Sequence, residues 1–227
     1  MKLSLFQADS LDIMRGLKKH SVDLIVTDPP YEVNVRGGIL TGIGKNWKSA
    51  YNYFEPIKDF RPYFKEMVRI LKPDAHCYVF TSRESHYELL SLGMMFFQVV
   101  EYIPLIKANC YPVSQYWLRN TELVIMFQKG RRVCNDQSQK NVLYGNRVIN
   151  EIHPTEKPVN ALGTLIKMSS DEGEVVLDPF MGGGSTGVAA VKLKRYFIGV
   201  EKYAKWYEPA VEKIKEEFHP TRQMRLL

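Results

Sequence analysis

Short apolar runs alternate with longer amphipathic segments along most of the chain. A run such as Val22–Thr27, rich in β-branched residues, is typical of a buried strand, whereas apolar residues repeated every three or four positions are typical of a helix. Strands are predicted near residues 3–6, 22–27, 76–81, 98–106, 121–128, 174–178 and 196–200. Helices are predicted near residues 10–19, 58–71, 84–92, 158–169, 186–194 and 203–217.

This alternation of helices and strands predicts an α/β fold with a parallel or mixed sheet in three layers. Ser10 is the expected N-cap of the first helix, and Pro73 is the expected stop signal after the second. The 227 residues have the size of one domain, covering 1–227. Two intervals contain long irregular stretches: residues 32–56, predicted to be a mobile loop, and the insert 107–152.

The segment Asp28-Pro29-Pro30-Tyr31 directly follows the strand predicted at 22–27. It therefore lies at the carboxyl end of a strand, where open α/β sheets bind their ligands. Because prolines donate no backbone hydrogen bonds and keep the chain extended, the carbonyls of Pro29 and Pro30 are expected to stay available as acceptors. With the Asp28 carboxylate and the Tyr31 ring, the segment would bind a flat ring that carries an NH2 group. The alternative is a structural strand end with Tyr31 packed nearby.

A glycine pattern follows the strand predicted at 174–178. Gly182, Gly184 and Gly187 fit G-x-G-x-x-G before a helix, and Glu201 ends the next strand at the spacing expected of a ribose-binding acid. Glycines allow a ligand to approach the backbone closely, and the start of the helix offers free N–H groups. By itself this pattern also fits an NAD-dependent oxidoreductase, and a purely structural glycine turn is a further alternative.

Together the two segments resemble the amino-methylating DNA methyltransferases that use S-adenosylmethionine. In that family Asp-Pro-Pro-Tyr is the catalytic motif and Asp-Pro-Phe-x-Gly-x-Gly is the cofactor motif. Residues 153–158 (HPTEKP) are similar to the family segment that opens the helix before the cofactor strand. The catalytic motif comes first here, as in the permuted β class, and the resemblance extends from Asp9 to Glu201. It implies a three-layer, Rossmann-like methyltransferase fold with a seven-stranded mixed sheet.

The resemblance implies roles for individual residues. Asp28 and the Pro29 carbonyl would accept the N–H groups of the target base, on which Tyr31 would stack, so the catalytic set is Asp28, Pro29, Pro30 and Tyr31. The implied cofactor-binding residues are Asp9, His153, Lys157, Phe180, Gly182, Gly184, Ser185, Thr186 and Glu201.

Within the cofactor set, Asp9 would contact the adenine and Glu201 the ribose hydroxyls. His153 and Lys157 would reach the methionine carboxylate. Phe180 would shield the sulfonium. Four alternatives remain: Asp9 as a helix cap, Glu201 as a surface acid, His153 as a turn residue and Phe180 as a core residue. Family members often have Ser or Thr where this chain has Gly183, so one hydroxyl contact is missing here.

Charge favours a polyanionic partner, because the net charge is +6 and the isoelectric point is about 9.1. In the resembling family the interval 107–152 holds target-recognition elements, and we expect the 32–56 loop to close over an extruded base. The residues expected to bind DNA are Arg36, Lys45, Lys129, Arg131, Arg132 and Arg147. A solvated loop is the alternative for these charges.

Other features exclude several classes of protein. The three cysteines lack C-x-x-C spacing, which argues against a disulfide framework or a metal site. No apolar run approaches the roughly 20 residues that cross a bilayer, and the first residues lack a signal-peptide pattern. The expected location is the cytoplasm of a bacterium or of a phage-infected bacterium.

Asp at the first motif position favours N6 of adenine as the target, in double-stranded DNA. Methylation of cytosine N4 is the alternative, as is a catalytically silent DNA-binding subunit of the same fold. The short insert favours a homodimer as the DNA-bound form. The motifs do not distinguish a lone methyltransferase from one with a cognate restriction enzyme.

Overall fold

The computed structural model describes residues 2–30, 55–110, 117–118, 120–146 and 156–218. Its strands are β1 (Leu3–Gln7), β2 (Val22–Thr27), β3 (Leu71–Thr81), β4 (Gln98–Lys107), β5 (Thr121–Lys129), β6 (Leu143–Gly145), β7 (Val175–Asp178) and β8 (Tyr196–Glu201). Its helices are α1 (Ser10–Gly16), α3 (Arg61–Ile70), α4 (His86–Gly93), α5 (Val159–Ser169), α6 (Ser185–Lys192) and α7 (Ala204–Glu217).

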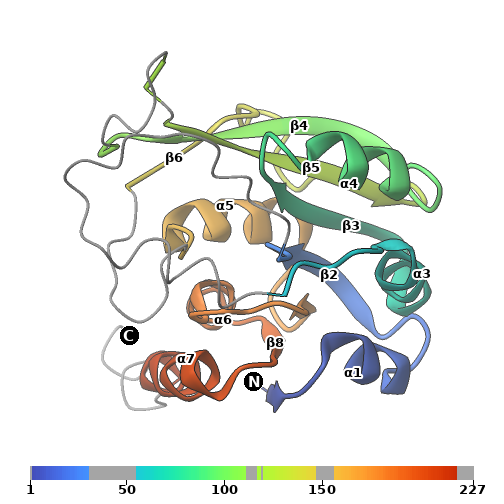
Figure 1. Ribbon diagram of the computed structural model, residues 1–227, viewed down its shortest axis with the longest axis vertical. Helices are drawn as coiled ribbons and strands as arrows, with labels where there is room; N and C mark the ends of the chain where they lie inside the picture. Colours follow the sequence, from blue (N-terminus) through green and yellow to red (C-terminus); the bar gives the residue numbers. More distant parts are fainter. Residues whose placement is uncertain (1, 31–54, 111–116, 119, 147–155, 219–227) are drawn as a thin grey trace.

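The strands form one mixed sheet in the order β1-β8-β7-β2-β3-β5-β4-β6 (Figure 1). The first five strands in this order are parallel, β5 runs antiparallel to β3 and β4, and β6 is parallel to β4. All seven predicted strands are present, and β6 is an eighth that the sequence did not predict. It lies inside the 107–152 insert, and three residues are too few to show a period.

Helices cover both faces of the sheet, which confirms the predicted three-layer α/β architecture (Figure 1). Side chains of β3 alternate between two cores: Tyr78 and Phe80 pack with α5, α6 and α7, whereas Cys77 and Val79 pack with α1, α3 and α4. Because successive strand residues point to opposite faces, one apolar run supplies both cores.

The cap of the first helix differs from the prediction. Asp9, not Ser10, caps α1, because its carboxylate accepts a hydrogen bond from the Leu11 backbone N–H at 3.0 Å. Pro73 follows the second helix, as the predicted stop signal requires. The helix ends at Ile70, and β3 begins directly after it at Leu71. Pro73 therefore lies in an exposed part of β3.

The parallel strands bring distant residues to one edge of the sheet. Asp28 follows β2, Asp178 ends β7 and Glu201 ends β8, so all three lie at the carboxyl edge. The antiparallel β5 starts at this edge and ends at the opposite one, where Lys129 pairs with Ala75. Within the described residues, no helix is long and apolar enough to cross a membrane.

Candidate active site

The two motifs meet through a buried hydrogen bond between neighbouring strand ends. Thr27 Oγ1, at the end of β2, donates to Asp178 Oδ1 at 2.9 Å. The same carboxylate oxygen accepts from the Phe180 backbone N–H at 3.0 Å. Burial raises the pKa of Asp178 to about 6, although the hydrogen bonds it accepts oppose the rise. This contact fixes the segment after β2 relative to the glycine turn after β7.

Asp28 belongs to a chain of four charged side chains at the carboxyl edge. Lys157 Nζ donates to Asp28 Oδ2 and lies 3.5 Å from Glu122 Oε2. Lys107 Nζ, at the end of β4, donates to Glu122 Oε1. The sequence predicted that Lys157 would face the cofactor carboxylate, and the structure places it against Asp28. Lys107 and Glu122 were not predicted; their only sequence signal is a charge at the end or start of a largely apolar strand.

Burial and charge have opposite effects on these groups. Burial raises the pKa of Asp28, and the charge of Lys157 opposes that rise. Burial alone would lower the pKa of Lys157, but Asp28 and Glu122 outweigh it and hold that pKa above its ordinary value. Burial alone would raise the pKa of Glu122, and the two lysines hold it below its ordinary value. Lys157 is therefore a cation at neutral pH.

The two proline carbonyls have different surroundings. Pro30 O accepts a hydrogen bond from the Ile57 backbone N–H at 3.1 Å, so this carbonyl is engaged, contrary to the expectation from the sequence. Among the described residues, no hydrogen bond to Pro29 O is found. Pro29 O is thus the backbone acceptor of the motif that remains a candidate for the target amine. Tyr31 and nearly all of the 32–56 loop lie outside the described residues.

The glycine turn and Glu201 form the second half of the site. Gly184 has a left-handed φ of 80° directly before α6, a conformation that favours glycine. Glu201 Oε2 accepts from the Gly182 N–H at 3.1 Å, and its Oε1 accepts from the Tyr203 N–H at 2.9 Å. Burial raises the pKa of Glu201. A carboxylate against a glycine turn at a helix start is a donor and acceptor set that suits a nucleoside-containing cofactor.

The remaining predicted cofactor residues lie around this turn, except one. Ser185 and Thr186 are buried at the start of α6, and the Phe180 ring lies 5.6 Å from the Tyr63 ring. Asp9 caps α1 at the end of the neighbouring β1, with Lys202 Nζ 3.6 Å from its carboxylate. His153 lies outside the described residues.

The family model for DNA methylases matches residues 22–212, which include both halves of this site. The chain belongs to the DNA methylase family. This confirms the expected membership among the S-adenosylmethionine-dependent methyltransferases that modify N6 of adenine or N4 of cytosine. It also argues against the NAD-dependent oxidoreductase alternative.

Similar proteins cover nearly the whole methylase. Type II methyltransferase M2.DpnII of Streptococcus pneumoniae is 26% identical over 95% of this chain and 91% of its own. The crystal structure of the M1.HpyAVI–SAM complex superposes with a TM-score of 0.70 at 23% identity, covering 93% of this chain and 99% of that one. The cytosine-N4-specific PvuII DNA methyltransferase gives a TM-score of 0.72 at 17% identity, covering 96% of this chain and 92% of that one. At these identities the two structures show a shared fold.

The basic cluster at 129–132 lies at the opposite edge of the sheet from Asp28. Lys129 Nζ donates to two backbone carbonyls, of Val68 at 2.7 Å and of Leu71 at 2.6 Å, at the end of α3. The structure therefore does not bring Lys129, Arg131 and Arg132 to the active site of the methylase. The other three residues expected to bind DNA lie outside the described residues: Arg36, Lys45 and Arg147.

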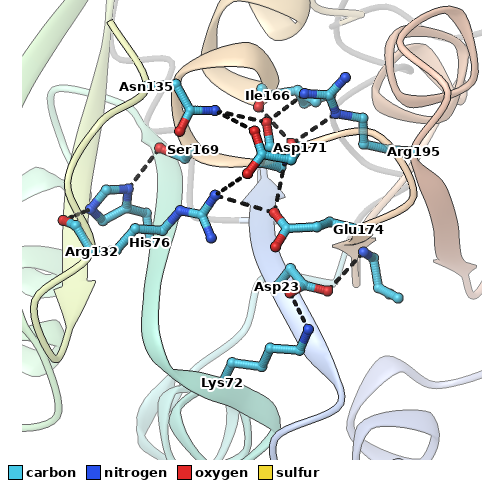
Figure 2. A network of polar contacts seen from close by, with 12 residues as sticks. Asp23, Lys72, His76, Arg132, Asn135, Ile166, Ser169, Asp171, Glu174 and Arg195 are labelled. Atoms are coloured by element: carbon cyan, nitrogen blue, oxygen red, sulfur yellow. Dashed lines mark hydrogen bonds and ion pairs between the residues drawn. The ribbon is translucent and has the colours of Figure 1, made fainter. Parts of the chain in front are cut away.

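Arg132 instead belongs to a polar network at this opposite edge of the sheet (Figure 2). Its guanidinium lies 3.2 Å from Glu174 and 3.6 Å from Asp171. Its carbonyl contacts His76 Nε2 at 3.0 Å, and Ser169 Oγ contacts His76 Nδ1 at 2.7 Å. Since a carbonyl only accepts, Nε2 carries a proton. Burial lowers the pKa of His76 to about 4, so at neutral pH Nδ1 is unprotonated and accepts from Ser169. The ring is therefore buried in its neutral form.

We expect the stability of this methylase to fall as the pH is lowered from 6.5 to 4. Burial lowers the pKa of His76 from 6.5 to about 4. In this window the unfolded chain binds a proton that the folded chain excludes, so the free energy of unfolding decreases by up to about 3 kcal/mol. Urea unfolding at a series of pH values measures this slope.

Two variants control for other acid effects. His76→Gln should remove most of the slope, whereas His20→Asn should remove only the smaller part that comes from the lowered pKa of this exposed histidine, and asparagine tolerates its positive φ of 59°. A slope that is equal in His76→Gln and the wild type would contradict the assignment.

Proposed function

We propose that this protein transfers a methyl group from S-adenosylmethionine to N6 of an adenine flipped out of double-stranded DNA. The observation that supports it most is the Asp28 carboxylate at the end of β2, joined through Thr27 and Asp178 to the glycine turn of the cofactor half. An acceptor for the target amine and a site for the methyl donor thus share one edge of the sheet.

The chemistry requires the amine to become a better nucleophile. The lone pair of adenine N6 is delocalised into the ring, and hydrogen bonds from its two N–H groups to Asp28 and Pro29 O favour a pyramidal nitrogen. Bound S-adenosylmethionine supplies an activated methyl group. The residues then act by orientation and by charge, with no covalent enzyme intermediate. Flipping the base costs about a few kcal/mol, and stacking on Tyr31 returns roughly 1–3 kcal/mol.

For the cofactor, we assign Glu201 to the ribose hydroxyls and Asp9 to the adenine end. The turn Gly182–Gly184 and the start of α6, with Ser185 and Thr186, would hold the methionine part. His153 and Phe180 keep their expected roles near the carboxylate and the sulfonium. Three observations support this: the three carboxyl ends of β1, β8 and β7 are neighbours, the turn is rich in backbone N–H groups, and Glu201 is anchored on it.

Glu201→Ala should weaken S-adenosylmethionine binding about 10- to 100-fold, because hydrogen bonds to a charged group are worth roughly 1.5–3 kcal/mol. Isothermal titration calorimetry measures the affinity. Glu172→Ala, which removes an exposed carboxylate with 63% of its side chain accessible, is the matched control and should bind normally. An unchanged affinity in Glu201→Ala would remove this residue from the site.

A groove at the carboxyl edge is our candidate surface for DNA bases beside the target. Its volume is about 600 Å³. Several of its lining residues are adjacent in sequence to Lys107 and Lys157 of the charged chain. The Tyr144 ring is 64% exposed there, and Asn160 Nδ2 donates to the Tyr144 carbonyl at 3.0 Å. Aromatic rings stack on bases, and side-chain amides read base edges. The groove is lined by Ile106, Ala108, Tyr144, Gly145, Asn146, Pro158, Val159 and Asn160.

Tyr144→Ala should weaken DNA binding about 10-fold, as expected for the loss of one stacking contact of roughly 1–3 kcal/mol. Arg131→Ala, at the opposite edge, should bind with the wild-type affinity and salt dependence. Fluorescence anisotropy with a methylatable duplex at several salt concentrations measures both. A weaker affinity with a flatter salt dependence in Arg131→Ala would instead favour the basic cluster as the DNA-binding face.

The proposal includes a biological setting. We infer one methyltransferase domain over 1–227, acting in the cytoplasm of a bacterium or of a phage-infected bacterium. A homodimer on DNA and a cognate restriction enzyme are the further partners we propose. The relationship to M2.DpnII, a type II methyltransferase, supports this setting.

Single-molecule sequencing of DNA from a methylation-deficient host that expresses the protein tests the function. N6-methyladenine at one short motif is the expected result. N4-methylcytosine would overturn the choice of base and keep the chemistry; it is the second candidate because the PvuII enzyme has a similar fold. Verified expression without modified bases would favour a silent DNA-binding subunit.

A further inference from the structure

Asp28 is in contact with a cation that the sequence assigned to the cofactor. Lys157 Nζ donates to Asp28 Oδ2, and only 7% of the Lys157 side chain is accessible. Glu122 lies on the other side of this ammonium at 3.5 Å and is itself bound by Lys107. Four charges of alternating sign therefore lead from the end of β4 to the end of β2.

We propose that Lys157 and Glu122 are positioning residues for methyl transfer: Lys157 keeps the Asp28 carboxylate ionised and oriented toward the target amine, and Glu122 holds the Lys157 ammonium in place. The inference rests on the proposed function, because it concerns the same reaction. Lys157 acts by its contact with Asp28, and Glu122 acts through Lys157. Neither residue is assigned a contact with the base.

The surroundings of Lys157 fix where its ammonium lies. Asp28 and Glu122 attract it from two elements, and the Phe80 ring of β3 has its centroid 5.3 Å from Nζ. An ammonium held from three sides fixes the direction of the carboxylate it binds. Because a carboxylate offers about four acceptor positions, Asp28 has the capacity to bind Lys157 and a target amine together.

Charge is the second part of the role. A half-buried carboxylate tends to take up a proton, and a protonated Asp28 would lose acceptor strength toward the amine. Among the described residues, the charged or titratable groups that influence Asp28 include Lys157, Glu122, Lys107 and Asp178. Of these, Lys157 opposes the rise of the Asp28 pKa most strongly, and Glu122 adds to that rise. The two proposed positioning residues therefore shift the titration of Asp28 in opposite directions.

This opposition gives the test. Carbon-13 NMR of labelled aspartate carboxyls, with the Asp28 signal assigned through Asp28→Asn, follows the titration of this group in the intact protein. Lys157→Met should raise the Asp28 pKa by about one pH unit or more, and Glu122→Gln should lower it. General damage to the fold would not move the pKa in opposite directions. A pKa that is unmoved in both variants would overturn the proposal.

Activity and cofactor binding supply the second readout. Lys157→Met should lower the single-turnover rate at least 10-fold. The acid limb of the pH–rate profile should move to higher pH, while the affinity for S-adenosylmethionine stays within about twofold of the wild type. A 10-fold loss of that affinity with an unchanged rate would show that Lys157 holds the cofactor carboxylate, and would overturn the proposal.

The carboxyl titration separates this inference from the proposed function, because it needs no methyl transfer. A wild-type protein that methylates no DNA would refute the function, whereas an unmoved Asp28 pKa would refute the positioning role. If Lys157→Met does not fold, the double variant Lys157→Met/Glu122→Gln is used instead. It removes one charge of each sign and leaves the net charge of the buried group unchanged. The double variant should show a higher Asp28 pKa than Glu122→Gln alone, and equal values would overturn the proposal.

Discussion

Asp28→Ala is expected to reduce the rate of methyl transfer at least about 1,000-fold, the upper end of the loss seen when one preorganised electrostatic group is removed. The carboxylate is the charged acceptor we assign to the target amine, and the Pro29 carbonyl alone would not hold both N–H groups. Single-turnover transfer of a labelled methyl group to a duplex measures the effect. S-adenosylmethionine should bind Asp28→Ala with nearly the wild-type affinity.

Two further variants make this result specific. Asp28→Ala removes a carboxylate that Lys157 Nζ contacts, so the double variant Asp28→Ala/Lys157→Met controls for a loss of rate caused by an uncompensated buried charge. Asp12→Ala removes a carboxylate on α1 that is 73% exposed and should be fully active. Turnover within 10-fold of the wild type in Asp28→Ala would exclude this residue from the reaction.

The fold was predictable because its signals are local. Strands buried on both faces give continuous apolar runs, so β2, β7 and β8 were found close to their observed bounds. The β6 strand was missed because its three residues gain their order by pairing with β4, which is not visible in a local pattern. The cap of α1 was placed one residue late for a related reason: Asp9 and Ser10 are both good caps, and only the backbone geometry selects Asp9.

The site was predictable where a motif follows a strand directly. Asp28 and Glu201 are fixed by β2 and β8, and the sheet then brings their edges together. The contact between Asp28 and Lys157 joins segments 129 positions apart in the chain, and no local pattern reports it. Sequence resemblance identified Lys157 as part of a motif, but the side chain it contacts depends on how β2, β5 and the segment before α5 pack.

The basic cluster shows what net charge alone does not specify. Lys129 and Arg132 lie within the predicted recognition insert 107–152, but the antiparallel direction of β5 carries them to the edge away from Asp28. There Lys129 donates a hydrogen bond to a backbone carbonyl, and Arg132 forms an ion pair with a carboxylate of the protein itself. Net charge indicates a polyanionic partner without indicating the face that meets it.

Gly183→Ala should lower the free energy of unfolding by about 2–3 kcal/mol, a typical cost of overpacking. A Cβ at this position would lie 1.9 Å from Glu156 Oε1 and 2.8 Å from Glu156 Cγ. Glu156 has little room to move, since its side chain is 3% exposed and Lys213 Nζ binds both carboxylate oxygens at 2.9 and 3.0 Å. Urea denaturation measures the loss.

A double-mutant cycle decides whether Glu156 is the cause. The single variant Glu156→Ala should lower the free energy of unfolding. Adding Gly183→Ala to Glu156→Ala should lower it almost no further, which gives a coupling energy between the two sites. Gly163→Ala is the matched control, because its Cβ would meet only Leu193 at an ordinary 3.9 Å and helix propensity favours alanine. Equal costs of Gly183→Ala with and without the Glu156 side chain would contradict the packing argument. A positive coupling would show that the Glu156–Lys213 ion pair occupies the space that a side chain at position 183 would need.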